Sequence, residues 1–355
     1  METIAFTGGG TGGHIYPGLA VVAHLPYYQV LWIGSNTGMD RGIIEKTGVA
    51  FFGIPAGKLR RYFSFENFRD VLKVISGFFA ARKILKKEKP ALLFSKGGYV
   101  SVPPVLAAAS LCIPVFIHES DFSPGLATKI ALRFTQKIFV AYPETATACG
   151  AKYQNKIIVS GNPVRMQFRN ADATAGRKFL NIDPDEKIVL ILGGSQGAHE
   201  VNNLIQESLP ELTKIYTVVH QTGNAEQYAP SFRYYPLAYI GEEMPHLLAA
   251  AELVVGRSGA GTVWECATVG VPMMLIPLRG NATRGDQVEN AGFFERAGAA
   301  LVLEQPDSKT LVETIYGFAH DPEKRNRMAA AAQKIGTLDG ACCISHAIKE
   351  FVEKS

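Results

Sequence analysis

Short apolar runs alternate with segments of helical periodicity along almost the whole chain. Apolar runs without polar alternation are typical of strands buried on both faces, and strands that alternate with helices predict parallel sheets covered on both sides. The expected strands of a first sheet are Ile4–Thr7, Val30–Ile33, Leu92–Ser95, Val115–His118 and Ile138–Ala141. Those of a second sheet are Ile188–Leu192, Tyr216–His220, Leu253–Val255, Met273–Ile276 and Ala300–Leu303.

A polar stretch separates the two sets of strands. Residues 162–185 are rich in residue types that favour turns, and 355 residues are enough for two domains with a core each. We therefore predict an α/β protein of two doubly wound, Rossmann-like parallel-sheet domains separated by a cleft. Helices are expected to close the chain at Ser308–His320, Pro322–Ile335 and Ala341–Glu353.

Both halves begin with a similar glycine-rich turn. Ile4–His14 aligns without gaps on Val189–His199, and each segment is typical of a buried strand, a turn and the start of a helix. The first turn contains G-x-G-x-x-G from Gly8, but the next strand ends at Ser35 without the acid that would bind a ribose, which disfavours a nicotinamide or flavin site. We expect backbone N–H groups at each helix start to bind an anion, usually a phosphate, the alternative being a tight turn without a ligand.

Two polar features near these turns could take part in chemistry. His14 closes the first turn, where a general base would reach a bound substrate, although a single histidine can also be a structural hydrogen-bonding group. Asp183-Pro184-Asp185 resembles a D-x-D metal–nucleotide motif, but it lies in a turn before a strand, where Asp and Pro are expected for backbone reasons. We expect no metal site there.

The composition excludes several classes of protein. Hydrophobic residues make up 47% and charged residues 19%, as in ordinary globular proteins, and a net charge of +4 gives no argument for nucleic-acid binding. Five cysteines, none in a C-x-x-C pattern, predict neither a disulfide scaffold nor a structural zinc site. The sequence has no signal-peptide pattern at its start and no apolar run of membrane-spanning length, so we expect neither a secretory precursor nor a transmembrane helix.

The basic residues are unevenly distributed. Residues 58–89 contain ten basic and three acidic side chains, a local charge of +7. Apolar residues are interspersed with them, so the segment could bind an anionic membrane surface, or it could be a solvated basic helix that packs on its own core. The residues expected to contact a membrane are Val71, Leu72, Ile75, Phe78, Phe79, Arg82, Lys83 and Lys86.

One segment has a highly distinctive sequence. Gly9–Ala20, which reads GGTGGHIYPGLA, resembles the opening loop of the MurG family of UDP-N-acetylglucosamine transferases. Other segments resemble blocks of that family in the same order: Ser95–Ser101, His118–Asp121, Gly161–Arg165, Gly193–Ala198, Arg257–Glu265 and Gly285–Ala291.

The resemblance implies a fold and an activity. The fold is GT-B, with an acceptor-binding, membrane-facing domain at 1–162, a UDP-GlcNAc domain at 163–340, and a helix at 341–355 that crosses back to the first domain. The activity is inverting transfer of GlcNAc from UDP-GlcNAc to the C4 hydroxyl of undecaprenyl-diphospho-MurNAc-pentapeptide in peptidoglycan synthesis, without a cofactor, at the cytoplasmic face of the cell membrane. Its other partners would be the anionic inner membrane surface and proteins of cell-wall synthesis.

The resemblance also assigns roles to individual residues. Thr11, Gly12 and Gly13 lie where the substrates meet, Arg165 and Ser195 approach the nucleotide, Gly241 meets the uracil, Ala260, Gly261 and Thr262 bind the diphosphate, Glu265 binds the ribose, and Gln287 binds the sugar. These residue types suit that chemistry, because a helix N-terminus stabilises a leaving UDP without a metal and a carboxylate accepts from two vicinal hydroxyls.

Two positions depart from the family pattern. Asp121 stands where many relatives have Asn, and Asp286-Gln287 stands where they have two Gln residues. The general base is therefore His14 or Asp121, with His14 preferred. The remaining alternatives are another GT-B enzyme, such as a UDP-GlcNAc 2-epimerase or a transferase with a soluble acceptor, and a catalytically silent nucleotide-sugar-binding protein.

Overall fold

The computed structural model describes residues 1–57, 65–193, 199–223, 227–279 and 285–354. The chain forms two compact units. The first unit combines Met1–Arg165 with Leu338–Ser355, and the second unit is Met166–Thr337. These bounds lie within a few residues of the domain limits expected from the sequence.

The first unit is built on a seven-stranded parallel sheet with strand order β3-β2-β1-β4-β5-β6-β7. The five expected strands correspond to β1, β2, β4, β5 and β6. Strands β3 and β7 are not predicted above, because both are edge strands with partly exposed side chains and so lack a continuous buried run. The strands are β1 (Thr3–Thr7), β2 (Gln29–Ser35), β3 (Ala50–Ile54), β4 (Leu92–Ser95), β5 (Val115–Glu119), β6 (Lys137–Val140) and β7 (Ile157–Val159).

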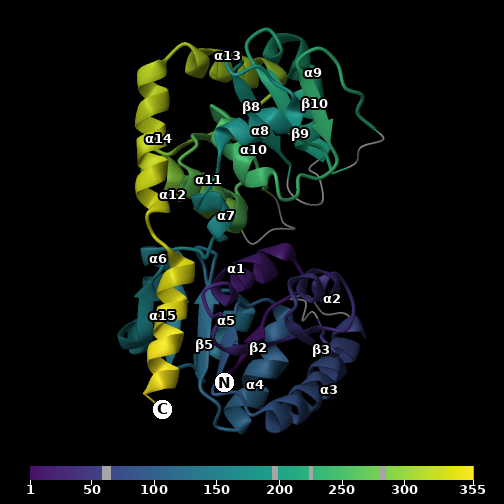
Figure 1. Cartoon of the computed structure of the whole chain (residues 1–355), viewed down its shortest axis with the longest axis vertical. Helices are drawn as coiled ribbons and strands as arrows, with labels where there is room; N and C mark the ends of the chain where they lie inside the picture. Colours follow the sequence, from purple (N-terminus) through teal and green to yellow (C-terminus); the bar gives the residue numbers. More distant parts are fainter. Residues whose placement is uncertain (58–64, 194–198, 224–226, 280–284, 355) are drawn as a thin grey trace. The chain divides into compact units, whose positions relative to one another are not determined.

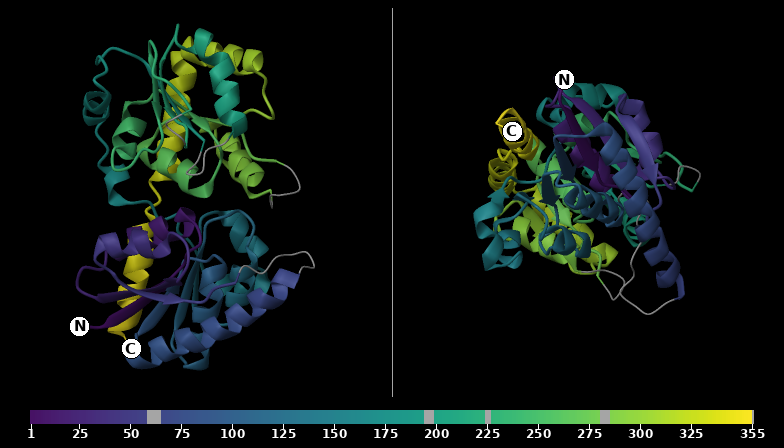
Figure 2. Two further views of the ribbon diagram at one scale, coloured as in Figure 1. Left: turned by 90° about the vertical axis from the view of Figure 1, so that its right-hand side faces the viewer. Right: turned by 90° about the horizontal axis from the view of Figure 1, so that it is seen from below.

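Helices cover both faces of this sheet (Figure 1). On one face, Leu85 of α3 and Val105 of α4 pack in the same core as Leu93 and Ile117 of the sheet. On the other face, α1, α2 and the last helix, α15, bury residues such as Ile344 against the sheet. Figure 2 shows α3 as the long helix on the outside of the first unit. The helices are α1 (Gly12–Val22), α2 (Asp40–Ile44), α3 (Phe65–Glu88), α4 (Val102–Ser110), α5 (Leu126–Ala131), α6 (Pro143–Ala148) and α15 (Gly340–Glu353).

The second unit has a six-stranded parallel sheet with strand order β10-β9-β8-β11-β12-β13. The edge strand β10, which contains a proline, is not predicted above. The strands are β8 (Ile188–Leu192), β9 (Thr217–Gln221), β10 (Tyr234–Leu237), β11 (Leu253–Gly256), β12 (Met273–Leu275) and β13 (Ala300–Val302). The helices are α7 (Met166–Arg169), α8 (Ala173–Leu180), α9 (His199–Leu212), α10 (Met244–Ala250), α11 (Ala260–Val269), α12 (Asp286–Arg296), α13 (Ser308–Ala319) and α14 (Pro322–Gly336).

The polar stretch 162–185 is not only a turn-rich linker, because it contains α7 and α8. The Asp172 carboxylate caps α8 by accepting from the Thr174 N–H at 2.9 Å. Asp183, by contrast, does lie in a turn: its Oδ1 accepts from the Asp185 N–H at 2.9 Å. The helices were missed because each is short and lies in a stretch rich in residues that favour turns.

Candidate active site

A buried acid holds the glycine-rich turn after β1. Asp40 is 0% exposed, and its Oδ1 accepts from the Gly10 N–H and its Oδ2 from the Ser35 N–H, both at 2.9 Å. A Cβ at Gly9 would lie 2.0 Å from Asp40 Oδ2, so the approach requires glycine. The strand itself ends without an acid, as the sequence analysis noted, but this acid five residues later binds the turn rather than a ribose.

Aromatic side chains fix the same turn from other sides. Trp32 Nε1 donates to the carbonyl oxygen of Gly8 at 3.0 Å. Gly10 has a φ of +83°, and a Cβ there would lie 2.5 Å from the Tyr99 ring. Thr11 follows as the N-cap of α1 in an extended conformation, and its side chain makes no capping bond. The backbone N–H groups of the first turn of α1 lie at the positive end of the helix dipole, where an anion would bind.

His14 lies in this first turn of α1, between Gly13 and the buried Ile15. Its ring packs against the glycines that follow β4, since a Cβ at Gly98 would lie 2.8 Å from His14 Cδ2. The Arg165 guanidinium lies 4.9 Å from the ring centroid of Tyr16, one turn or less further along α1. The structure thus brings together five predicted site residues around this helix: Thr11, Gly12, Gly13, His14 and Arg165.

Asp121 lies in the loop after β5, at the same edge of the sheet. The loop is organised by Glu119, whose Oε1 accepts from the Asp121 N–H at 3.1 Å. Glu119 Oε2 accepts from the Gly125 N–H at 2.9 Å and from Thr128 Oγ1 at 2.7 Å. In the sheet, β4 lies between β1 and β5, so the loops that carry His14 and Asp121 flank the end of β4. Doubly wound parallel sheets bind ligands at this edge.

In the second unit, the N-termini of α11 and α12 are tied together. Ser258, which precedes α11, is 0% exposed, and its Oγ donates to the carbonyl oxygen of Gln287 at 2.7 Å. Asn290 Nδ2 donates to the carbonyl oxygen of Ser258 at 3.2 Å. The side-chain oxygen of Gln287 accepts from the Leu278 N–H at 3.0 Å. This bond fixes the orientation of the Gln287 amide group.

The other residues that we expect to bind the donor lie at the same edge of the second sheet. Ala260, Gly261 and Thr262 form the first turn of α11, after Gly259 as N-cap, and Glu265 follows in the next turn. Gly241 lies between β10 and α10, and the preceding Ile240 N–H donates to the buried Gln221 side chain at 3.0 Å. Ser195 lies outside the described residues.

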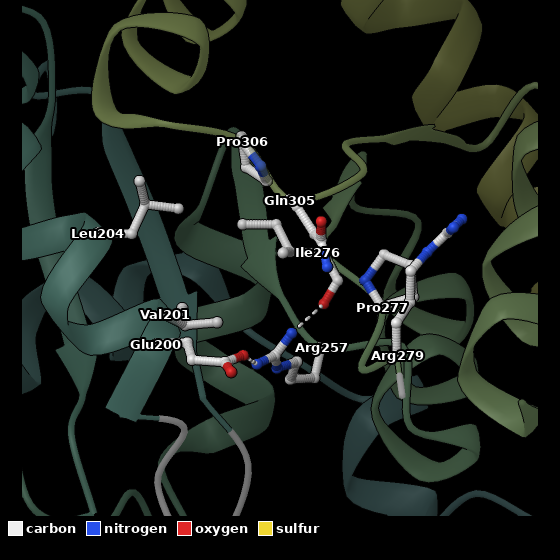
Figure 3. A pocket seen from close by; sticks show the side chains of 9 residues that line it. All are labelled: Glu200, Val201, Leu204, Arg257, Ile276, Pro277, Arg279, Gln305 and Pro306. Carbon is white, nitrogen blue, oxygen red and sulfur yellow. Dashed lines mark hydrogen bonds and ion pairs between the residues drawn. The ribbon is translucent and has the colours of Figure 1, made fainter. Parts of the chain in front are cut away.

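A cavity of about 300 Å³ opens beside this edge, next to α9. Arg257 crosses its floor, donating to the carbonyl oxygen of Ile276 at 3.1 Å and pairing with Glu200 of α9 at 2.5 Å (Figure 3). These two interactions hold the Arg257 side chain in place at the cavity. Of the described residues that we expect to bind the donor, none is among those that line it, which are Glu200, Val201, Leu204, Arg257, Ile276, Pro277, Arg279, Gln305 and Pro306.

The basic segment 58–89 is described from residue 65 onward, and Phe65–Glu88 form helix α3, whereas Lys58, Arg60 and Arg61 lie outside the described residues. Leu72 and Phe79 are 52% and 64% exposed, and Val71, Ile75, Lys83 and Lys86 are also exposed. Phe78 is partly buried against the core of the unit, and Arg82 is half-buried with its Nε donating to Ser110, while a membrane contact of these residues stays a prediction. Among the described residues, no helix combines the length and the apolar character needed to span a bilayer.

Sequence reasoning missed four groups that shape these sites: Asp40, Glu119, Ser258 and Asn290. Glu119 stood inside a segment that resembles a family block, but nothing in its local sequence indicates three hydrogen bonds to its own loop. The signal for Asp40 was weaker still, because its partner Gly10 is thirty residues away. Most of the hydrogen bonds given above for these residues join them to backbone groups, and a motif does not record such contacts.

The fold and these two sets of loops define a glycosyltransferase of GT-B architecture. Residues 4–140 match the glycosyltransferase family 28 N-terminal domain, and residues 188–341 match its C-terminal domain. The chain is 44% identical to the UDP-N-acetylglucosamine–N-acetylmuramyl-(pentapeptide) pyrophosphoryl-undecaprenol N-acetylglucosamine transferase of Treponema denticola, with 99% of this chain and 98% of the relative covered. The chain belongs to this family of transferases, the MurG family.

Solved structures agree with this assignment. The crystal structure of Acinetobacter baumannii MurG is similar at a TM-score of 0.75 and 25% identity, covering 99% of this chain and all of that one. UDP-GlcNAc 2-epimerase from Neisseria meningitidis shares the fold at a TM-score of 0.70 but only 14% identity, over the full length of both chains. The fold alone therefore does not separate transferase from epimerase, whereas the sequence relationship does.

Proposed function

We propose that this protein transfers GlcNAc from UDP-GlcNAc to the C4 hydroxyl of undecaprenyl-diphospho-MurNAc-pentapeptide, with inversion at the anomeric carbon. The observation that carries the proposal is the full-length similarity to a relative named for this transfer, joined to a histidine at the anion-binding start of α1. In this proposal the first unit binds the acceptor and the membrane surface, and the second unit binds the donor.

His14 acts as the general base. The proton of the C4 hydroxyl passes to the imidazole while the hydroxyl oxygen attacks C1 of GlcNAc. The bond from C1 to the diphosphate oxygen breaks, and its electron pair leaves with UDP. An imidazole suits this role at neutral pH, and the packing of His14 against Gly97 and Gly98 supports a fixed ring orientation. Asp121 then accepts a hydrogen bond from the acceptor, a role that the Asn of many relatives could also fill.

The donor is held without a metal. The N–H groups of Ala260, Gly261 and Thr262 at the start of α11 stabilise the charge that develops on UDP, and Glu265 accepts from both ribose hydroxyls. Gln287 donates its amide N–H groups to the sugar, since its oxygen already accepts from Leu278. Arg165, Ser195 and the backbone around Gly241 complete the nucleotide site in this proposal.

Helix α3 docks the enzyme on the cytoplasmic face of the cell membrane. Its exposed Leu72 and Phe79 would enter the interface while Lys83 and Lys86 attract anionic lipid, each worth on the order of 1 kcal/mol near the surface. A membrane-bound acceptor makes such docking useful, because it keeps the enzyme at its substrate. We also expect contacts with other proteins of cell-wall synthesis.

One assay tests the function against its rivals. UDP release from UDP-GlcNAc is measured with and without a short-chain lipid-linked MurNAc-pentapeptide, and the sugar product is identified. The proposal requires UDP release that depends on the lipid acceptor and a disaccharide product. UDP release without acceptor, together with a free epimerised sugar, would indicate an epimerase, and binding without turnover would indicate a silent nucleotide-sugar-binding protein.

A further inference from the structure

A buried amide side chain lies beside the segment where we expect the uracil of the donor to bind. Gln221 is the last residue of β9 and is 5% exposed. Its Oε1 accepts from the Ile240 N–H at 3.0 Å, and Gly241 follows Ile240 directly. Gln221 therefore lies next to the backbone that is expected to meet the uracil.

The alternation of side chains along β9 places Gln221 on the face of the sheet that points away from α9. The neighbouring His220 points toward α9, because its Nε2 lies 3.0 Å from Asn202 Oδ1. Successive side chains of a strand point to opposite faces, so Gln221 points the other way. Helix α10, which begins shortly after Gly241, packs against α11, which carries the residues expected to bind the diphosphate and the ribose. Gln221 thus faces the segment that leads into this pair of helices.

The backbone opposite Gln221 is held in register with the end of β9. The Thr222 N–H donates to the carbonyl oxygen of Leu237 at 2.8 Å. The Gly223 N–H donates to the carbonyl oxygen of Ala238 at 3.0 Å. These bonds continue the pairing beyond β10, so the segment expected to meet the uracil starts from a fixed place relative to the Gln221 side chain.

The bond from Ile240 also sets the orientation of the Gln221 amide. A backbone N–H can only donate, so the side-chain atom that it meets is the oxygen, and Nε2 lies at the other end of the amide. Among the residues that the structure describes, Nε2 of Gln221 has no hydrogen-bond partner. Because buried N–H groups are nearly always bonded, a pair of donors at this place indicates a ligand that accepts hydrogen bonds.

We propose that Gln221 is the residue that selects uracil, by donating a hydrogen bond from Nε2 to the oxygen at C4 of the base; the inference rests on the proposed function. Uracil has a carbonyl oxygen at C4, whereas cytosine has an amino group there, which only donates. Two donors that face each other cannot bond, so a cytidine nucleotide would leave both groups unpaired in a buried place. The site therefore accepts uridine nucleotides and rejects cytidine nucleotides.

Calorimetric affinities for UDP and CDP test the proposal, and the readout is the dissociation constant of CDP divided by that of UDP. Gln221→Glu keeps an oxygen for the Ile240 N–H and replaces the donor by an acceptor; the titrations are done at pH 8 to keep the new carboxyl ionised. We expect UDP binding to weaken about tenfold or more while CDP binding does not weaken, so the ratio falls about tenfold or more. Gln206→Glu is the matched control, because Gln206 lies on α9 and its Nε2 donates to Tyr234 Oη at 2.7 Å, and there the ratio should not change.

A structural role alone would act on both nucleotides alike. An unchanged ratio in Gln221→Glu would therefore overturn the inference, and so would an equal fall of the ratio in Gln206→Glu. If Gln221→Glu does not fold, Gln221→Met takes its place, since it also lacks the donor, and the ratio is expected to fall in the same way.

Transfer by the wild type with the lipid acceptor tests the proposed function separately. A wild type that transfers GlcNAc and prefers UDP, combined with an unchanged ratio in the Gln221 variants, would show that the proposed function holds and that Gln221 does not select the base. A wild type that transfers GlcNAc but binds UDP and CDP equally would overturn the inference as well.

Discussion

Replacing Asp40 by alanine removes the acceptor of two backbone N–H groups, those of Gly10 and Ser35. Each buried donor left without a partner costs about 1–3 kcal/mol, which gives roughly 2–6 kcal/mol for the pair. Gly10 is partly exposed and can be reached by water, so we expect about 3 kcal/mol of destabilisation of the first unit. Asp40→Asn keeps one acceptor and turns an amide N–H toward the other donor, so about half of that loss is expected.

The two tryptophans of the chain allow this to be measured one unit at a time. Trp32 belongs to the first unit and Trp264 to the second. In a Trp264→Phe background, fluorescence during urea unfolding reports on Trp32, whose Nε1 donates to Gly8 in the same turn. Glu45→Gln is the control, because its pair with Arg41 is exposed and contributes at most about 1 kcal/mol. If the urea midpoint of unfolding shifts no more for Asp40→Ala than for Glu45→Gln, the role given to Asp40 is refuted.

Four further predictions concern the reaction and the membrane. Glu265→Ala should lower UDP-GlcNAc affinity by about tenfold or more, because a ribose-specific contact is lost, and unchanged affinity by calorimetry in a folded variant would contradict the donor assignment. His14→Ala should lower turnover about 10²-fold or more, whereas Asp121→Asn should keep most activity; the reverse order in a steady-state assay would move the base to Asp121. Transfer should survive EDTA, and activity restored only by Mn²⁺ or Mg²⁺ would show that a metal is required. Lys83→Gln combined with Lys86→Gln should weaken flotation with anionic vesicles, as should high salt. Binding of the variant equal to that of the wild type would show that these lysines of α3 do not bind the membrane.

The central strands were predictable because they are buried on both faces. Runs such as Ile188–Leu192 contain no polar residue, and parallel central strands are built from such runs. The edge strand β3 is fully buried only at Ile54, so it lacks the continuous buried run that identifies the central strands. The helices α7 and α8 were missed because each is short and lies among residues that favour turns, although Asp172 shows a helix start once its partner is known.

The candidate site was predictable where a residue acts through its own motif. His14 and Ala260 lie at helix starts that the glycine-rich segments indicate directly. Asp40 and Ser258 act through backbone groups far along the chain, so their roles depend on the register of the packed sheet. A single sequence records such contacts only as an isolated acid or serine.

The packing of α15 on the first unit has a consequence for synthesis on the ribosome. Residues such as Ile344 and Ile348 complete the core beside Phe94 and Phe116, and Phe116 meets Phe351 at a centroid distance of 5.2 Å. The strands of this unit emerge early, but the helix that covers them emerges only after the second unit. At 5–20 residues per second, translation of that unit takes roughly 10–35 s. During this interval the apolar part of the face that α15 covers stays exposed, so we expect the first unit to reach its complete core only after the whole chain has been made.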